Sequence, residues 1–319
     1  MLTRRTAIGT ALPAVLASRA RAAGSFQGFV AGIYAEAAAE GIRRDVLDAA
    51  FAGVTPNQEV IEKDQKQAEF TMTWTRYRAL VISDKRIADG RAAVAQNRAL
   101  FGQVESNFHV APPVIAGIWG LESSFGVITG KYKVVEALAT LAWEGRRAAF
   151  FRGELMAALK ILNNGDVTPA KMTGSYAGAM GQPQFMPTSF LRLAVDFDGD
   201  GKRDIWSSKA DVLGSIANFL ARSGWRVGET WGQPVKVPAG VVAGGRDGKR
   251  PLAEWAHQGV TPASGRWAAP GDMPAGVLAP DGATGETFMV FNNFNAIRRY
   301  NPSDFYAIAV GLIGDWVMS

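Results

Sequence analysis

The feature that most constrains the fold is the helical spacing of apolar residues over most of the first two-thirds of the chain. From residue 24 to about residue 222, apolar side chains recur three or four positions apart, which places them on one face of an α-helix. The pattern returns near the C-terminus. The sequence therefore predicts a mainly α fold, with helices over 26–39, 44–52, 86–101, 112–125, 134–143, 148–163, 211–223 and 305–316.

The composition changes near Trp225. Seven of the 15 prolines lie between Pro234 and Pro280, together with many glycines, and these residues interrupt regular structure. Short β-prone segments lie among them, at 235–237 and 287–291. We therefore expect a small β-rich insertion within an otherwise helical protein.

The residue types available for chemistry are few. The chain has no cysteine and two histidines, which excludes disulfides, a thiolate nucleophile, an iron–sulfur cluster and a lipid anchor on cysteine. Of 319 residues, 48% are hydrophobic and 20% charged, which is typical of a globular protein with a substantial core. Any catalysis must come from carboxylates, hydroxyls, amides, lysine, arginine or tyrosine.

The N-terminus predicts export. Arg4-Arg5, a weakly apolar run and Ala20-Arg21-Ala22 are typical of a twin-arginine-type signal peptide over residues 1–22; the alternative is a weak N-terminal helix of a cytosolic protein. Residues 1–22 hold four arginines and no acidic residue, so their removal would lower the net charge from +5 to +1. A near-neutral protein lacks the basic surface that nucleic acids require. No other stretch approaches the length of a membrane span, so we expect a periplasmic protein without lipid or transmembrane anchor.

Glu122 is an unusual residue for its position. Its helix-surface neighbours are Ile118, Trp119 and Phe125, and such apolar surroundings raise the pKa of a carboxyl group. A glutamate that stays protonated near neutral pH can act as a general acid. The alternative is a glutamate whose carboxylate reaches water at the end of its helix.

A second unusual segment runs from Gly174 to Phe190. It is rich in glycine and small residues and also contains two glutamine amides, hydroxyls and aromatic rings. Small residues allow a ligand to approach the backbone closely, amides and hydroxyls can hydrogen-bond sugars, and Tyr176 and Phe185 offer flat faces for stacking. The alternative is a tightly packed structural turn.

These segments together resemble a known family. The ordered runs at 120–126, 174–190, 194–201, 214–219, 293–295 and 299–307 are similar to those of the lytic murein transglycosylases of the B type. The resemblance covers nearly the whole chain after the signal peptide. It implies a lysozyme-like helical core (residues 106–225 and 290–319), an α-rich N-terminal part (24–105) and the β-rich insertion (226–289).

The resemblance also implies an activity and a site. The family cleaves the MurNAc-β-1,4-GlcNAc bond of peptidoglycan without water and leaves a 1,6-anhydro-MurNAc end. Carried over by motif position, Glu122 is the general acid/base, Ser175 and Gln184 bind MurNAc, and Tyr300 lies near the reacting sugar. Weaker carry-overs to the substrate site are Asn293, Asn295 and Asn301. The resemblance implies glycan strands as partners, with other cell-wall enzymes as further candidates, and no cofactor for the chemistry.

A single carboxylate is sufficient for such a reaction. Ordinary glycosidases use two carboxylates, but here the N-acetyl group of MurNAc can act in place of the second. Two other functions stay open at this point: a hydrolysing muramidase on the same fold, and a non-catalytic peptidoglycan-binding protein.

The run from Asp196 to Gly201 fits the first half of a calcium-binding loop. Oxygen-bearing residues at loop positions 1, 3 and 5 are followed by glycine at position 6. Position 12 is Ser207 instead of glutamate, although the related family loop also takes a late aspartate. The predicted structural calcium ligands are Asp196, Asp198, Asp200, Lys202 and Asp211. The alternative is a turn whose carboxylates cap the following helix.

Overall fold

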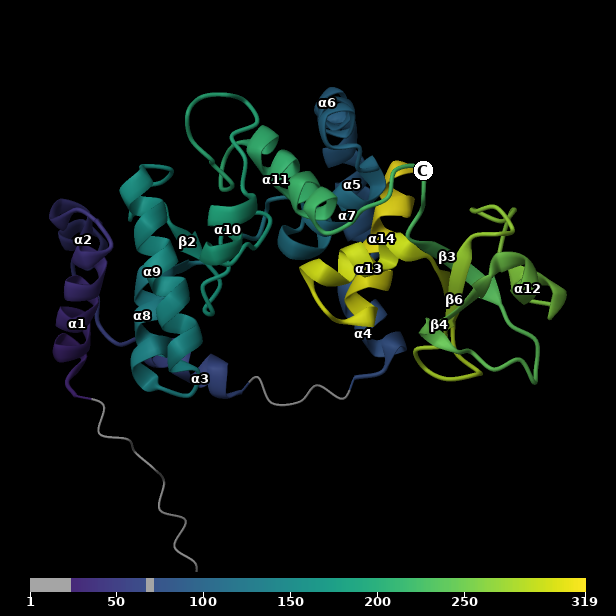
Figure 1. The fold of residues 1–319 in the computed structure, drawn as a ribbon, viewed down its shortest axis with the longest axis horizontal. Coiled ribbons are helices and arrows are strands. Elements are labelled where there is room, and N and C mark those ends of the chain that lie inside the picture. Colours follow the sequence, from purple (N-terminus) through teal and green to yellow (C-terminus); the bar gives the residue numbers. More distant parts are fainter. Residues whose placement is uncertain (1–23, 67–71) are drawn as a thin grey trace, which may run out of the picture.

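The computed structural model describes residues 24–66 and 72–319, which form a mainly helical protein with a small sheet at one end (Figure 1). The predicted fold class is therefore confirmed. The predicted signal peptide lies outside the described residues. No helix in the described ranges combines the length and the hydropathy needed to cross a bilayer.

One helical layer lies at the end of the molecule that contains the described N-terminus (Figure 1). Apolar residues at helical spacing on each of its helices meet in one shared core. The long pair at its centre is α8 (Val134–Glu144) and α9 (Ala148–Asn164), and the others pack around this pair. These others are α1 (Phe26–Ala39), α2 (Arg44–Ala50), α3 (Gln58–Gln65) and α10 (Pro187–Leu193).

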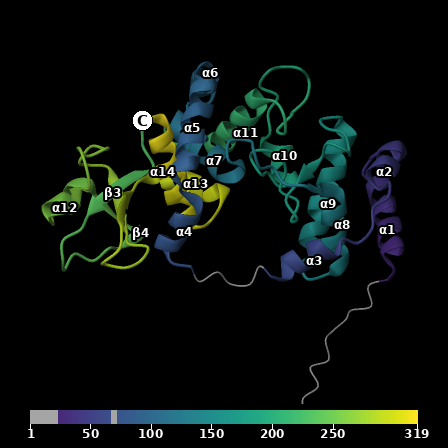
Figure 2. The ribbon, with the colours of Figure 1, turned by 180° about the vertical axis from the view of Figure 1, so that it is seen from behind.

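The centre of the molecule is built on a pair of helices, α7 (Pro112–Ser123) and α14 (Asp304–Met318), which pack closely against each other. A side chain at Gly117 would meet the Val310 carbonyl oxygen at 2.1 Å, and one at Gly314 would meet the Pro113 carbonyl oxygen at 2.1 Å. Glycine at these positions lets the two backbones approach, and this fixes the position of α7. Seen from behind in Figure 2, the neighbouring helices are α4 (Trp74–Val81), α5 (Asp84–Gln96), α6 (Arg98–Phe108), α11 (Lys209–Arg222) and α13 (Asn292–Tyr300).

The β-rich part lies at the opposite end from α1 and α2 (Figure 1). Its five antiparallel strands have the order β4-β6-β7-β3-β5, and α12 (Leu252–His257) packs on it around the buried Trp255. The strands are β3 (Gly232–Lys236), β4 (Gly245–Pro251), β5 (Thr261–Pro262), β6 (Pro274–Leu278) and β7 (Thr287–Val290). A separate pair, β1 (Tyr132–Lys133) and β2 (Thr173–Gly174), lies beside α8.

Two predicted helices end differently in the structure. The helix expected over 86–101 is divided at Asn97, whose side-chain amide donates to the Ala93 carbonyl at 2.8 Å. Asparagine competes with the helix for backbone hydrogen bonds in this way. The helix that carries Glu122 ends two residues earlier than expected, because Ser124 and Phe125 take left-handed backbone conformations (φ 49° and 59°).

Candidate active site

Glu122 lies in the last turn of α7 and is half-buried. Its Oε1 accepts a hydrogen bond of 2.6 Å from the Tyr306 hydroxyl of α14. Burial raises the pKa of Glu122 to about 7, and the hydrogen bond from Tyr306 opposes that rise. A substantial fraction of this carboxyl group is therefore protonated near neutral pH and can donate a proton.

The side chain of Phe125, in the turn after Glu122, packs against α7 and holds this turn in place. The Phe125 ring packs edge-on against Trp119, with the ring centroids 5.5 Å apart. Glycines make room for it: a side chain at Gly120 would meet the ring at 2.5 Å, and one at Gly90 of α5 at 2.4 Å. The end of α7 is therefore held by packing from both sides, which limits the movement of Glu122.

Three tyrosines surround Glu122. The Tyr300 ring stacks on Tyr306, with centroids 6.4 Å apart, and its hydroxyl donates to the Pro183 carbonyl at 2.6 Å. Burial, followed by the negative charge of Glu122, raises the pKa of Tyr77 to about 12 and those of Tyr300 and Tyr306 well above their usual value. All three stay protonated at physiological pH, so Tyr306 remains a hydrogen-bond donor to the carboxylate.

The segment Gly174–Phe190 is held against the chain that follows Glu122. Strands β1 and β2 pair Tyr132 with Gly174, and a side chain at Gly130 would meet the Gly174 carbonyl oxygen at 2.1 Å. The Gln184 amide donates to the Thr129 carbonyl at 3.1 Å. Glu122 and this segment therefore belong to one site, although they are about fifty residues apart in the sequence.

A buried amide links the same segment directly to α7. The Gln182 Oε1 accepts hydrogen bonds from the Trp119 indole (2.8 Å) and from the Lys209 ammonium (2.9 Å), and its amide donates to the Trp206 carbonyl (2.8 Å). A side chain at Gly126 would meet the Gln182 Oε1 at 2.4 Å. The hydrogen bonds of Gln182 thus connect α7 and α11 to the Gly174–Phe190 segment.

This arrangement is found together with a family match over nearly the whole described chain. Residues 25–315 match the Transglycosylase SLT domain. The chain belongs to this family. Membrane-bound lytic murein transglycosylase B of Escherichia coli (strain K12) is 34% identical over 246 residues, which is 76% of this chain and 67% of that relative.

Solved structures of transglycosylases agree with the match. SltB3 from Pseudomonas aeruginosa, in complex with NAG-anhNAM-pentapeptide, has a TM-score of 0.88 and 43% identity, covering 92% of this chain and 80% of that one. Escherichia coli Slt35 in complex with calcium has a TM-score of 0.76 and 31% identity, covering 92% of each chain. The resemblance to lytic murein transglycosylases of the B type is confirmed, and with it the expected enzyme class.

Ser175 and Gln184, the two residues predicted to bind MurNAc, are half-buried and keep hydrogen-bonding capacity. Ser175 Oγ accepts a hydrogen bond of 3.0 Å from the Ala179 amide, which leaves its own proton to donate. Gln184 has a left-handed backbone (φ 52°), and its amide nitrogen donates to the Gly181 and Thr129 carbonyls. Among the described residues nothing donates to its Oε1, so this oxygen can accept from a ligand.

Asn293, one of the three predicted asparagines, is enclosed within the protein. It is fully buried, and its side chain accepts from the Arg226 amide (2.7 Å) and donates to the Arg226 and Glu229 carbonyls (2.8 and 2.7 Å). These bonds join α13 to the start of the β-rich part. We therefore assign Asn293 a structural role, because its polar atoms are already used by the backbone.

The two other asparagines lie near the end of α13. Asn301 accepts a hydrogen bond of 3.1 Å from the Ser303 amide, in the turn that leads into α14. Asn295 is half-buried, and among the described residues its side chain has no hydrogen-bond partner.

The stacking role expected of Phe185 is wrong, because its side chain is 2% exposed and packs on Phe219 and Tyr300.

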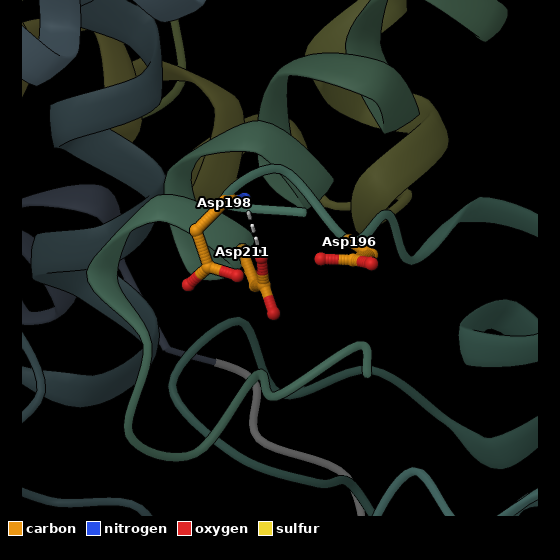
Figure 3. A group of neighbouring side chains, drawn as sticks. All are labelled: Asp196, Asp198 and Asp211. Carbon is orange, nitrogen blue, oxygen red and sulfur yellow. Dashed lines mark hydrogen bonds between the residues drawn. The ribbon is translucent and has the colours of Figure 1, made fainter. Parts of the chain in front are cut away.

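The predicted calcium loop brings together three of its five candidate residues. Asp196, Asp198 and Asp211 each place a carboxylate oxygen within 4.8 Å of the others (Figure 3). Asp200 and Lys202 are not part of this group, since the Asp200 carboxylate instead accepts from the Lys202 amide at 2.9 Å. The third carboxylate of the group comes from Asp211, near the start of α11. Three carboxylates converging in this way fit a cation that prefers oxygen ligands.

The carboxylates of this loop also organise its backbone. Asp211 is fully buried and accepts from the Phe197 and Asp204 amides, both at 2.7 Å. Asp196 accepts from the Gly199 and Gly201 amides, both at 2.8 Å. All four amides belong to the loop itself, and the following helix, α11, is capped by Ser208, whose Oγ accepts from the Asp211 amide at 3.2 Å. The carboxylates therefore hold the loop backbone and do not cap the helix.

Tyr306 and Tyr77 are the site residues that the sequence did not predict. Each lies in an ordinary helix. Nothing in the sequence separates Tyr77 from core aromatic residues, whereas Tyr306 lies in the run 299–307 that resembles the family. Tyr306 is 184 positions away from the carboxyl group that it contacts. Their place beside Glu122 follows only from the packing of α4 and α14 around α7.

Proposed function

We propose that this protein cleaves the MurNAc-β-1,4-GlcNAc bond of peptidoglycan without water, with Glu122 as its only general acid and base. The observation that carries the proposal is the state of Glu122: half-buried, with a pKa of about 7, and held by a tyrosine hydroxyl. Among the described residues, no second carboxylate contributes to that pKa shift. A lone protonated carboxyl group suits a reaction in which the substrate supplies the other reactive group.

The proposed reaction has two steps. Glu122 donates its proton to the glycosidic oxygen as the N-acetyl carbonyl oxygen of MurNAc bonds to C1, and the GlcNAc part leaves as an alcohol. The Glu122 carboxylate then takes the proton of the C6 hydroxyl of the same MurNAc, whose oxygen bonds to C1 and displaces the N-acetyl oxygen. The anhydro ring is closed, Glu122 is protonated again, and no water is consumed.

The surrounding residues support both steps. Tyr306 keeps its own proton throughout, because its pKa lies well above the usual value, and it orients the carboxylate that forms in the first step. Ser175 can donate to the acetamido group, and the free Oε1 of Gln184 can accept from the same sugar. Holding the attacking oxygen near C1 removes much of the entropic barrier to ring closure.

The relatives support the choice of substrate. SltB3 is seen with NAG-anhNAM-pentapeptide, a ligand that contains an anhydro sugar and a peptide. We infer that this chain likewise acts on glycan strands that bear peptide stems. The N-terminal sequence supports export to the periplasm, and association with other cell-wall enzymes stays a prediction of the resemblance.

We also propose a structural calcium ion held by Asp196, Asp198 and Asp211, as supported by their convergence and by the calcium complex of Slt35. The cation would offset the mutual repulsion of three carboxylates and take no part in the reaction. A cation that binds only the folded protein stabilises it by mass action. Melting with calcium should therefore occur at higher temperature than melting with a chelator, and the Asp198→Asn variant should lose the difference. Equal melting temperatures for the wild type would overturn the proposal.

The deciding experiment for the reaction is digestion of purified sacculi followed by mass spectrometry of the products. Anhydro ends differ from hydrolysed ends by the mass of one water. Anhydro products from the wild type, and none from Glu122→Gln, are expected. Reducing ends would indicate a hydrolysing muramidase, and binding without any cleavage would indicate a non-catalytic peptidoglycan-binding protein.

A further inference from the structure

The loop between β6 and β7 contacts a helix that comes much earlier in the sequence. The Asp281 Oδ1 accepts a hydrogen bond of 2.6 Å from the Trp74 amide. Its Oδ2 accepts from the amide and from the hydroxyl of Thr75, at 2.8 and 2.6 Å. Trp74 and Thr75 begin α4, which lies beside the β-rich part in Figures 1 and 2. A carboxylate 206 positions away from Thr75 therefore caps this helix.

These bonds complete the hydrogen bonding at the N-terminus of α4. The first amides of a helix have no carbonyl partner within the helix. Thr73 accepts from the Arg76 amide at 3.3 Å, and Asp281 accepts from the two amides between them. The hydrogen bond from the Thr75 hydroxyl, followed by those from the two amides, lowers the pKa of Asp281, so its negative charge is present at neutral pH and is favoured at this helix end. A helix of 8 residues depends on such contacts.

The other end of the same loop, residues 279–286, holds the first side chain of α4. The Glu286 Oε2 accepts from the Trp74 indole at 2.7 Å. The Phe288 ring of β7 packs edge-on against that indole, with the ring centroids 5.7 Å apart. Trp74 is fully buried. The loop and β7 therefore fix both the backbone and the first side chain of the helix.

The next turn of α4 carries a tyrosine beside the catalytic acid. The Tyr77 ring packs on those of Trp74 and Phe305, with centroids 6.2 and 5.9 Å away. Phe305 directly precedes Tyr306, the residue that donates to Glu122. Burial, followed by the charge of Glu122, raises the pKa of Tyr77, which places these two side chains within electrostatic reach of each other. The position of α4 therefore affects how Glu122 is enclosed.

We propose that Asp281 is a positioning residue for the catalytic acid: it holds α4 so that Tyr77 keeps water away from Glu122. This inference rests on the proposed function, in which a protonated Glu122 starts the reaction. Burial is the main cause of the raised pKa of Glu122. When α4 is released, water reaches the carboxyl group and its pKa falls toward that of an exposed glutamate. Asp281 thus acts on the reaction through α4 and Tyr77.

The test measures the pKa of Glu122 by NMR titration of labelled glutamate carboxyl carbons, in which the Glu122 signal is identified by its absence from Glu122→Gln. Asp281→Ala is expected to lower this pKa by ~1 unit, which reduces the protonated fraction at pH 7 about 5-fold. The alkaline limb of the rate of sacculus digestion should move to lower pH by the same amount. Asp281→Asn keeps one acceptor oxygen and should give a smaller shift in the same direction.

The control removes a cap from a helix in the other helical layer. The Asn57 Oδ1 accepts from the Val60 amide at 3.2 Å at the start of α3, so Asn57→Ala should destabilise the protein without changing the pKa of Glu122.

An unchanged pKa of Glu122 in folded Asp281→Ala overturns the proposal. An equal shift in Asn57→Ala also overturns it, because the effect would then come from a general loss of stability. If Asp281→Ala does not fold, an unchanged pKa in Asp281→Asn overturns the proposal. Wild-type digestion without anhydro products would overturn the proposed reaction instead, and it leaves the NMR result readable.

Discussion

The molecule contains two groups of carboxylates that are built in opposite ways. Glu122 is half-buried, and within the described part of the chain it has a single hydrogen-bond donor, the Tyr306 hydroxyl; burial raises its pKa to about 7. Asp211 is fully buried but accepts backbone amides from Phe197, Asp198 and Asp204, in a loop with two further aspartates. Burial raises the pKa of both carboxyl groups, and backbone amides oppose that rise at Asp211. We therefore expect the carboxyl group with few donors to be reactive and the one that the backbone saturates to be structural.

The largest expected effect is the loss of activity in Glu122→Gln. The amide has nearly the same size as the carboxyl group but can neither donate the catalytic proton nor take one back, so turnover of sacculi should fall ~10²–10⁴-fold. The matched change in the aspartate loop, Asp200→Asn, should leave turnover unchanged. Circular dichroism verifies that both variants are folded. Rapid turnover by folded Glu122→Gln would place the acid elsewhere.

The structural role of the aspartate loop is tested by Asp211→Ala. Its loss leaves the Phe197 and Asp204 amides without their acceptor, so the free energy of unfolding should fall by about 2–4 kcal/mol. Urea unfolding measures this change, and Asp200→Ala in the exposed part of the same loop is the control, with a change within ~0.5 kcal/mol. An unfolding free energy equal to that of the wild type would show that the loop backbone does not depend on Asp211.

The stability of the protein should depend on the protonation of Glu122. Its pKa of about 7 in the folded state lies above the value of 4.5 expected when exposed, so the stabilisation linked to the bound proton is complete below pH ~4.5 and is lost as pH rises through about 7. The Glu122→Gln variant has no proton to release at this position, so its stability does not fall with pH for this reason. Between pH 4 and pH 8 its unfolding free energy should therefore gain ~1–3 kcal/mol relative to the wild type, after a discount for partial exposure. Parallel pH profiles of the two proteins would contradict the raised pKa.

The smallest effect is expected for Tyr306→Phe. Its hydroxyl lowers the pKa of Glu122, so its removal should raise that pKa further and move the alkaline limb of the pH–rate profile to higher pH. Loss of one positioned hydrogen bond should lower turnover by up to ~10-fold. Tyr132→Phe, which removes a hydroxyl bound to the exposed Glu59, is the control and should leave the profile in place. An unshifted limb in Tyr306→Phe would mean that this bond does not tune the acid.

A good part of this chemistry could be predicted from local sequence. The helical spacing gave most of the helix positions, and the apolar neighbours of Glu122 were enough to expect a raised pKa. Alternating aspartates around Gly199 and Gly201 identified the loop. These features depend on residues within a few positions of one another, where backbone geometry fixes which side chains share a face.

The remaining features depend on contacts between distant segments. Tyr306 reaches Glu122 only because Gly117 and Gly314 let α7 and α14 approach, and Gly130 lets the chain after Glu122 pack on Gly174. Packing also decided that Asn293 is saturated by backbone groups and that Phe185 is buried. Local sequence determined which residues have unusual chemistry, whereas only the tertiary structure decided which of them meet, because burial and hydrogen-bond partners are set by the packing of helices that lie far apart in the chain.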